Sequence, residues 1–217
     1  MAEFLASAKA VAADRSRGNA GRLIFALDAT MSRQPTWDLA CHLQGSMFDA
    51  AAAVGGLDVQ LVYFQGHGKA RASRWASNAA ELKDLMTGVQ CQGGLTQIER
   101  VLDHAERQAA KAPLPSLVYV GDAMEEDIDV LCHKAGQLAL RNTRAFMFLE
   151  GSDQTAERAF REIARLTGGV FLRFDRSSAQ QLKDLLAAVA TYSAGGRPAL
   201  EKRGGASAKR LLKDMRQ

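Results

Sequence analysis

Five residues with hard oxygen ligands stand in three short, well-separated segments of this chain. The first segment offers a carboxylate and two hydroxyls, from Asp28, Thr30 and Ser32, at a spacing of two residues. The second segment contributes Thr96 and the third contributes Asp122. Carboxylate and hydroxyl oxygens are the ligands that suit magnesium, calcium or manganese. The chemistry that this set predicts is therefore the binding of a divalent cation.

The elements around these residues predict that they meet. Asp28 and Asp122 each follow an apolar, strand-like run, at residues 23–27 and 117–120. Thr96 opens a helix-like stretch. In an open parallel sheet, ligands bind beyond the carboxyl ends of the strands. Both acids are thus expected where such a sheet places a ligand.

Helix capping is the alternative interpretation of the same residues. Acids and hydroxyls are good N-caps, so Asp28, Ser32, Thr96 and Asp122 could each cap the helix that follows. Each residue taken alone fits this reading well. The occurrence of all five in order favours the metal site.

The pattern resembles the metal-ion-dependent adhesion site of von Willebrand factor A (vWA) domains. That family's motif is Asp-x-Ser-x-Ser, then a distant Thr and a distant Asp. Thr30 stands where Ser is more usual and keeps the hydroxyl, and Leu95 is an extra residue within the usual Gly-Gly-Thr. Residues 160–171, with a Thr-Gly-Gly turn at 167–169, also resemble the family's helix, turn and last strand.

This resemblance implies a non-enzymatic protein-interaction module. A divalent cation, Mg²⁺ first and Mn²⁺ or Ca²⁺ otherwise, would be held by Asp28, Thr30, Ser32, Thr96 and Asp122, with the two acids acting mostly through waters. The cation would bind a Glu or Asp of a protein partner. Intracellular bacterial relatives often work beside an AAA-type ATPase or other products of one operon, which suggests a partner of that kind. The family also suggests that occupancy repositions the last helix of the domain.

The hydrophobic pattern predicts an α/β fold, with a doubly wound, Rossmann-like and mostly parallel sheet and helices on both faces. One short, basic strand is expected as an antiparallel edge. The expected strands are residues 23–27, 57–64, 70–75, 116–121, 145–149 and 170–174. The expected helices are residues 35–54, 81–87, 96–110, 128–140, 155–166 and 179–192.

Length and composition fit one domain with extensions. Of the 217 residues, 47% are hydrophobic, enough for a sizeable core. We expect an N-terminal extension at residues 1–20 with a short helix at 2–13, a vWA-like domain at 21–193, and a basic, flexible tail at 194–217 with a short helix at 206–215. The net charge of +4 is concentrated toward that tail.

The cysteines and the chain's N-terminal residues predict a cytoplasmic protein. Cys41, Cys91 and Cys132 are odd in number and fit no zinc spacing, so free thiols in a reducing compartment are expected. The first residues lack a basic leader followed by an apolar run. No stretch approaches the roughly 18 apolar residues of a membrane helix.

Two other functions stay open. One is a Mg-dependent phosphoryl-transfer or phosphatase enzyme on a similar fold, although a haloacid-dehalogenase-like site would want a second acid where Thr30 stands. The other is an RNA-associated module that uses residues 195–217. Nucleic acid is otherwise not expected, because a basic edge at Lys69, Arg71 and Arg74 with one aromatic, Trp75, is more typical of a solvated strand.

A run of acids follows Asp122. Glu125, Glu126, Asp127 and Asp129 precede or open the helix expected at residues 128–140. An acidic rim that attracts a cation is one interpretation. We favour the other, in which these acids stabilise the first turn of that helix through its dipole.

Overall fold

A computed structural model describes residues 20–30, 34–66, 68–174 and 179–215. The helix predicted at residues 2–13 lies outside these ranges. The strands are β1 (Gly21–Asp28), β2 (Leu57–Gln65), β3 (Lys69–Ala76), β4 (Ser116–Gly121), β5 (Arg144–Glu150) and β6 (Val170–Phe174). The helices are α2 (Gln34–Leu43), α3 (Gly45–Ala52), α4 (Ala79–Thr87), α5 (Ile98–Lys111), α6 (Ile128–Leu140), α7 (Gln154–Leu166), α8 (Ala179–Arg203) and α9 (Gly205–Asp214).

The strands form one six-stranded sheet in the order β3-β2-β1-β4-β5-β6. All neighbours are parallel except β2 and β3, which form an antiparallel pair at one edge. The chain moves outward from β1 to β2 and β3, and then returns to the other side of β1 as β4. The strand order therefore reverses between β1 and β4. The predicted α/β class, the mostly parallel sheet and the antiparallel edge strand are confirmed.

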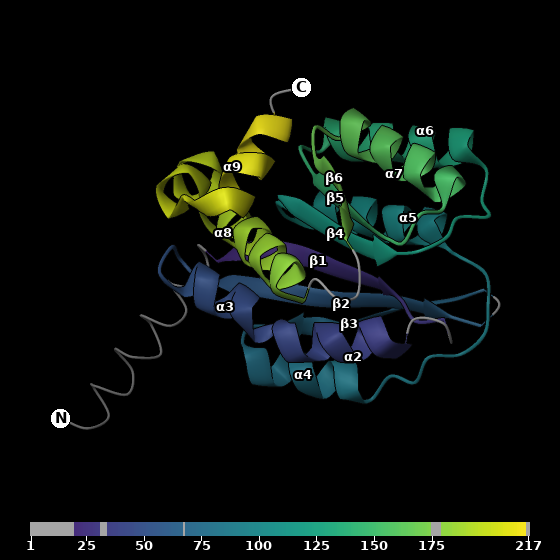
Figure 1. The fold of residues 1–217 in the computed structure, drawn as a ribbon, viewed down its shortest axis with the longest axis horizontal. Coiled ribbons are helices and arrows are strands. Elements are labelled where there is room, and N and C mark those ends of the chain that lie inside the picture. Colours follow the sequence, from purple (N-terminus) through teal and green to yellow (C-terminus); the bar gives the residue numbers. More distant parts are fainter. Residues whose placement is uncertain (1–19, 31–33, 67, 175–178, 216–217) are drawn as a thin grey trace.

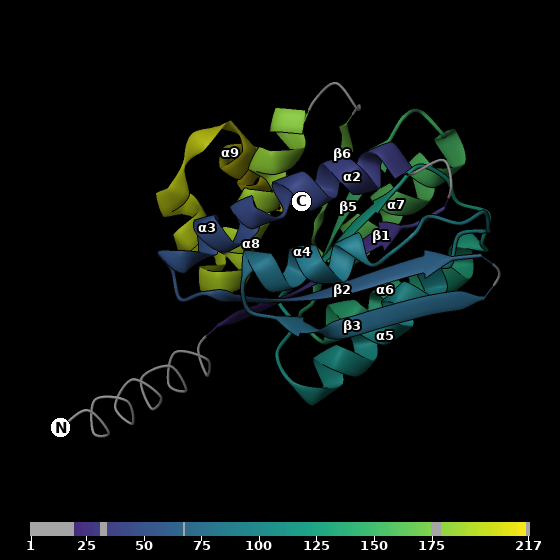
Figure 2. The ribbon, with the colours of Figure 1, turned by 90° about the horizontal axis from the view of Figure 1, so that it is seen from below.

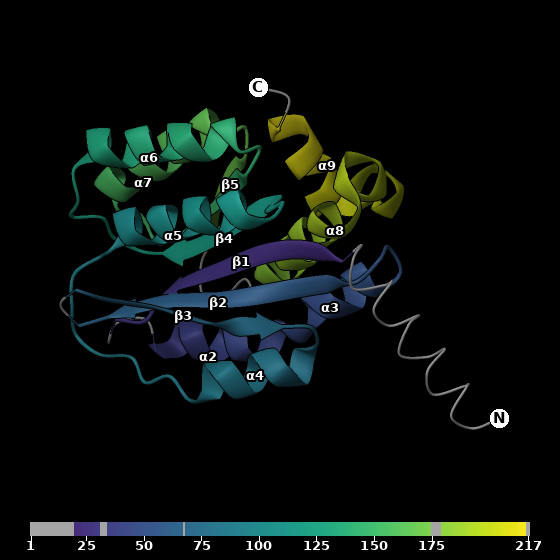
Figure 3. The same ribbon diagram turned by 180° about the vertical axis from the view of Figure 1, so that it is seen from behind.

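Helices cover both faces of the sheet (Figure 1). One layer contains α2, α3, α4, α8 and α9, and the other contains α5, α6 and α7; Figure 3 shows the two layers on opposite sides of the strands. Because side chains alternate along a strand, Phe25 enters the first layer's core and Ile24 enters the second. This double coverage explains why β1 and β4 read as nearly continuous apolar runs.

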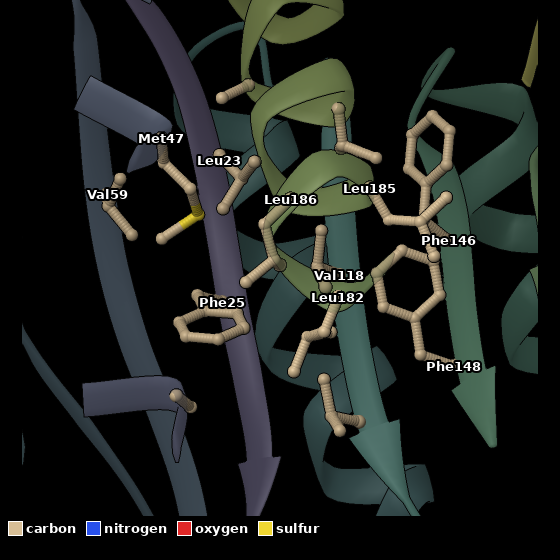
Figure 4. Packing of buried hydrophobic residues seen from close by; sticks show 14 of the residues in the cluster. Leu23, Phe25, Met47, Val59, Val118, Phe146, Phe148, Leu182, Leu185 and Leu186 are labelled. Carbon is tan, nitrogen blue, oxygen red and sulfur yellow. The ribbon is translucent and has the colours of Figure 1, made fainter. Parts of the chain in front are cut away.

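The N-terminal part of α8 is anchored across the middle of the sheet (Figure 4). Leu182, Leu185 and Leu186 point toward Phe25 of β1 and Phe146 of β5, and all five side chains are almost fully buried. Burying one such leucine contributes about 1.5–3 kcal/mol. These contacts fix the helix over the strands whose ends carry Asp28 and Asp122.

The helix predicted at residues 35–54 is in fact two helices, α2 and α3, separated at Gln44. Gly45 is a poor residue for a helix interior, and the Ser46 hydroxyl donates to the Leu43 carbonyl at 2.7 Å, in competition with the helical ladder. The side-chain amide of Gln44 donates to the Ala79 carbonyl of α4 at 3.1 Å. The break thus lets the two helices meet α4 and the sheet separately.

The C-terminal residues differ from the flexible tail expected at 194–217. Helix α8 continues to Arg203 across a kink at Gly196, whose φ of 66° and ψ of −162° are essentially restricted to glycine. Helix α9 follows, and Leu200 and Leu211 are wholly buried in the same core as α8. The basic side chains lie on the outer surface, while the apolar ones pack, so residues 197–214 belong to the folded domain.

None of the three cysteines is assigned to a disulfide, as predicted. Cys41 is buried, and Cys91 and Cys132 are half-buried. Burial, followed by the nearby Asp38 carboxylate, raises the pKa of Cys41 to about 11, so its thiol stays protonated and unreactive at neutral pH. None of the helices in the described ranges has the length and apolar character needed to cross a membrane.

Candidate metal centre

Asp28 and Asp122 lie at the point where the strand order reverses. In the parallel pair of β1 and β4, Leu27 is level with Val120. Asp28 is the next residue of β1, and Asp122 lies two residues beyond Val120. Asp28 is buried and Asp122 is half-buried. Ligands of doubly wound sheets bind in the crevice at this switch point, so both predicted acids are where such a site belongs.

Three hydrogen bonds hold the loop after Asp28 in place. The Thr30 amide donates to the Asp28 Oδ1 atom at 2.8 Å. The Ala29 amide donates to the Phe64 carbonyl of β2 at 3.0 Å, and the Ala29 carbonyl accepts from the Gln92 amide at 2.9 Å. The first segment is therefore tied both to the neighbouring strand and to the loop that carries Thr96. Ser32 lies outside the described residues.

A close backbone contact positions the loop that carries Thr96. A Cβ atom added at Gly94 would lie 2.1 Å from the Gly66 carbonyl oxygen, in the turn between β2 and β3. The Gln97 side-chain amide donates to the same carbonyl at 3.4 Å. Two residues after the glycine, Thr96 is only 6% exposed. Glycine at position 94 is therefore needed for this loop to reach the carboxyl edge of the sheet.

Capping does not explain Thr96 or Asp122. Helix α5 begins at Ile98 with Gln97 at its N-cap, which makes no side-chain capping bond. Helix α6 is capped by Asp127, whose carboxylate accepts from the amides of Asp129 and Val130. The alternative reading therefore fails for these two residues, since other residues occupy the capping positions.

Glu125 joins two of the loops through Thr96. Its Oε2 atom accepts from the Thr96 hydroxyl at 2.7 Å and from the Thr96 amide at 3.0 Å. In return, the Glu125 amide approaches the Thr96 hydroxyl oxygen at 3.2 Å. The hydroxyl proton thus points to a carboxylate, and a lone pair of the oxygen remains for a cation.

Glu126 caps α5 rather than its own helix. Its carboxylate accepts from the Ile98 amide at 2.6 Å and from the Glu99 amide at 2.9 Å. The expectation that the whole acidic run stabilises α6 is therefore wrong for Glu125 and Glu126 and right for Asp127 and Asp129. The sequence alone does not show whether two glutamates before a helix stabilise that helix or another one. The answer depends on which helix end lies near them in the folded chain.

A further buried carboxylate stands at the same edge of the sheet. Glu150, the last residue of β5, is 5% exposed and accepts a hydrogen bond from the Thr36 hydroxyl of α2. This contact ties α2, and with it the chain that leaves Asp28, to the end of β5. The sequence signal was an acid directly after an apolar strand, the same signal that marked Asp28 and Asp122.

The donor set fits a hard cation only if hydroxyls take part. Within the described residues, no three His, Cys, Asp or Glu side chains gather in a metal-binding group. Two carboxylates and the hydroxyls of Thr30 and Thr96, from three loops that are hydrogen-bonded to one another, provide oxygen ligands only. Such a set suits Mg²⁺ or Mn²⁺ better than zinc or copper.

Comparison with known proteins found similarity in structure alone. No family profile matches the sequence, and no curated protein matches it. A von Willebrand factor type A protein from Catenulispora acidiphila is similar with a TM-score of 0.66 at 18% identity, over 80% of this chain and 43% of that one. The SpRpn10 VWA domain is similar with a TM-score of 0.61 at 12% identity, over 81% of this chain and 98% of that domain.

A third similar structure holds a metal. Proximal thread matrix protein 1 from the mussel byssus, solved with zinc in its metal-ion-dependent adhesion site, matches with a TM-score of 0.62 at 15% identity, over 79% of this chain and 46% of that one. The chain spans less than half the length of the first and third of these proteins. At such identities the likeness concerns the fold, and the fold of this chain is that of a vWA domain.

Proposed function

We propose that this domain binds a divalent cation, Mg²⁺ before Mn²⁺ or Ca²⁺, and uses it to capture a carboxylate of a protein partner. The ligands are Asp28, Thr30, Ser32, Thr96 and Asp122. The observation that carries the proposal is the convergence of three interlocked loops at the switch point of the sheet. The vWA fold, typical of interaction modules, and the zinc site of the mussel protein support it.

The bound cation supplies an electrophilic position for a Glu or Asp side chain. The protein's own residues hold the loops in place: Asp28 orients the Thr30 amide, and Glu125 orients the Thr96 hydroxyl. Leu95 is 55% exposed beside Thr96, so an apolar residue next to the partner's acid would find a contact there. The domain then works by binding and needs no nucleophile or general base.

Cysteines that are not assigned to disulfides, together with the type of site, fit an intracellular bacterial vWA protein that acts in the cytoplasm. The partner that supplies the carboxylate would be an AAA-type ATPase or another protein encoded in the same operon. These assignments rest on the family resemblance and belong to the proposal.

Titration of the full chain with Mg²⁺ and Mn²⁺ by calorimetry, with thermal unfolding alongside, tests the function. We expect saturable binding at one site that raises the melting temperature. A short peptide with one glutamate should then bind only when the ion is present, and its glutamine counterpart should not. The ion dependence isolates the carboxylate contact from any general affinity for peptides.

Three results would contradict this function. Absence of ion binding at millimolar concentration would leave only structural polar contacts. Equal binding of the glutamate and glutamine peptides would make the ion structural. Hydrolysis of a phosphate ester that depends on both the ion and Asp28 would favour the enzyme alternative.

Replacing Glu125 by glutamine should weaken ion binding by about tenfold, the lower end of the effect of residues that orient metal ligands. Glutamine keeps the shape but removes the charge that holds the Thr96 hydroxyl proton. Glu126→Gln is the matched control, because it removes the same charge from the same loop but touches the Ile98 and Glu99 amides instead. Calorimetry should show weaker ion binding in the Glu125 variant only. Equally weakened ion binding in both variants would mean that only the net charge of the loop matters.

A further inference from the structure

The outer edge of β3 is open for pairing. Strand β3 stands at the end of the sheet and pairs with β2 alone among the described strands. Figure 2 shows it at the margin of the sheet, with α4 on one side and α5 on the other. An edge strand presents unpaired backbone N–H and C=O groups, which can pair with an added strand.

The two faces of β3 offer different surroundings to such a strand. On the α5 side, Ala70 and Ala72 are too small to fill the space beneath the helix, and a hollow of about 470 Å³ remains. Arg100 and Arg107 of α5 line this hollow, which we name the β3 groove. On the α4 side, a second hollow of about 330 Å³ is lined by the apolar side chains of Tyr63 and Leu85, and also by Arg71 and Ser73.

The positive charge of the β3 groove is not neutralised from within. Among the described residues, no carboxylate forms an ion pair with Arg71, Arg100 or Arg107, and Arg100 donates instead to the Gly68 carbonyl at 3.0 Å. Of the acids that line the groove, Asp103 is engaged by Lys134 at 2.7 Å. The groove therefore has a surplus of arginine charge over an apolar floor.

His104, on the wall of the groove, has a pKa that depends on its burial and on this positive charge. Its Nε2 atom lies 2.8 Å from the Gln60 Oε1 atom. Burial first, and then Arg107 and Lys111, lower the pKa of His104. The imidazole is therefore neutral at pH 7, and negative charge brought into the groove would raise its pKa again.

We propose that the β3 edge binds an extended peptide segment in which acidic and apolar residues alternate. The segment pairs with β3 as an additional strand. Its acidic side chains face α5 and meet Arg100 and Arg107, and its apolar side chains face α4 and meet Tyr63 and Leu85. A strand's alternation of side chains matches the difference between the two hollows.

Nucleic acid fits this edge less well. The ring of Trp75, the aromatic residue of β3, is covered by the Arg22 guanidinium at 4.1 Å and cannot stack on a base. Arg74 pairs with Glu81 at 3.5 Å, which leaves less of its charge for a phosphate. Arg71, Arg100 and Arg107 line the groove, where spaced carboxylates can reach them.

A blocked heptapeptide of alternating valine and glutamate, four valines and three glutamates, is the probe. Binding is measured by calorimetry in the presence of EDTA, so that the cation site cannot take part. We expect saturable binding that weakens with salt, and slower hydrogen exchange of amides in residues 69–76. The imidazole pKa of His104, followed by NMR, should rise on binding.

Charge variants locate the site. Arg100→Gln and Arg107→Gln should each weaken binding of the peptide by up to about fivefold, which is the contribution of one exposed ion pair to an affinity. Arg74→Gln is the control, because it removes the same charge from β3 itself, at a residue that does not line the groove. A peptide with lysine in place of glutamate should not bind.

Four results would overturn the proposal. The first two are no binding of the glutamate peptide and no protection from hydrogen exchange in residues 69–76. The third is a loss of peptide affinity in the Arg74 variant equal to that in the groove variants. The fourth is tighter binding of a single-stranded oligonucleotide than of the peptide. Because EDTA is present throughout, these outcomes are independent of whether the cation site functions.

Discussion

Asp28→Asn is expected to abolish the stabilisation by divalent cations while leaving the cation-free protein as stable as before. The amide keeps an oxygen that can accept from the Thr30 amide, so the loop retains its hydrogen bond. It removes one of the two carboxylates that a divalent cation would need at the switch point. In EDTA the free energy of unfolding should therefore stay close to that of the wild type.

The size of the lost effect follows from mass action. An ion at one hundred times its dissociation constant stabilises the native protein by about 2.7 kcal/mol. For a chain of this length, that corresponds to a rise of about 5–10 °C in melting temperature. Thermal unfolding of the wild type and of Asp28→Asn, each with and without Mg²⁺, measures it.

Asp58→Asn provides the control. Asp58 lies near the start of β2, at the opposite end of the strands, where it accepts from the Ser77 hydroxyl at 2.8 Å. This variant should keep the full response to the ion. If Asp28→Asn were strongly destabilised in EDTA and the wild type did not respond to Mg²⁺, Asp28 would have a structural role only.

Strands and strand ends could be predicted because their signals are local. The continuous apolar runs of β1 and β4 indicated strands covered on both faces, and the structure has helices on both. The position of Asp28 and Asp122 directly after these runs placed them at the carboxyl edge. Parallel pairing then brings the two acids to the same crevice, whatever the details of the loops.

The contacts of Glu125 and Glu126 could not be predicted, because they depend on two loops that meet only in the folded chain. Glu125 binds Thr96 across 29 positions of sequence, and Glu126 binds Ile98 across 28. In the sequence, both glutamates stand beside α6, and a local rule assigns them to it. The tertiary arrangement gives them to the N-terminal end of α5 instead.

The C-terminal helices show how composition can hide a periodic pattern. Glycines and basic residues dominate residues 194–217 and suggested a tail. Ala208, Leu211 and Met215 nevertheless recur at three- and four-residue steps and form the buried side of α9. With Leu200, they join the core under α8. The basic side chains that suggested a tail are the solvated side of the same helices.

Gly94→Ala is expected to weaken both the fold and the cation site. The new methyl group would lie 2.1 Å from the Gly66 carbonyl oxygen, which is backbone and cannot rotate away. The loop must then move off the β2–β3 turn, which carries Thr96 out of position. Overpacking of this kind costs about 1–3 kcal/mol, and a displaced ligand should weaken ion binding by at least about tenfold.

Gly93→Ala is the matched control for this change. The neighbouring position has no heavy atom within 4 Å of an added Cβ, so its variant should stay within about 0.5 kcal/mol of wild type and bind the ion normally. Thermal unfolding in EDTA and calorimetric titration with Mn²⁺ would compare the pair. Wild-type ion affinity in Gly94→Ala would show that the contact with Gly66 does not position Thr96. Equal losses in both variants would show that the loop tolerates no side chain at all, and the close approach at Gly94 would then not be what sets the site.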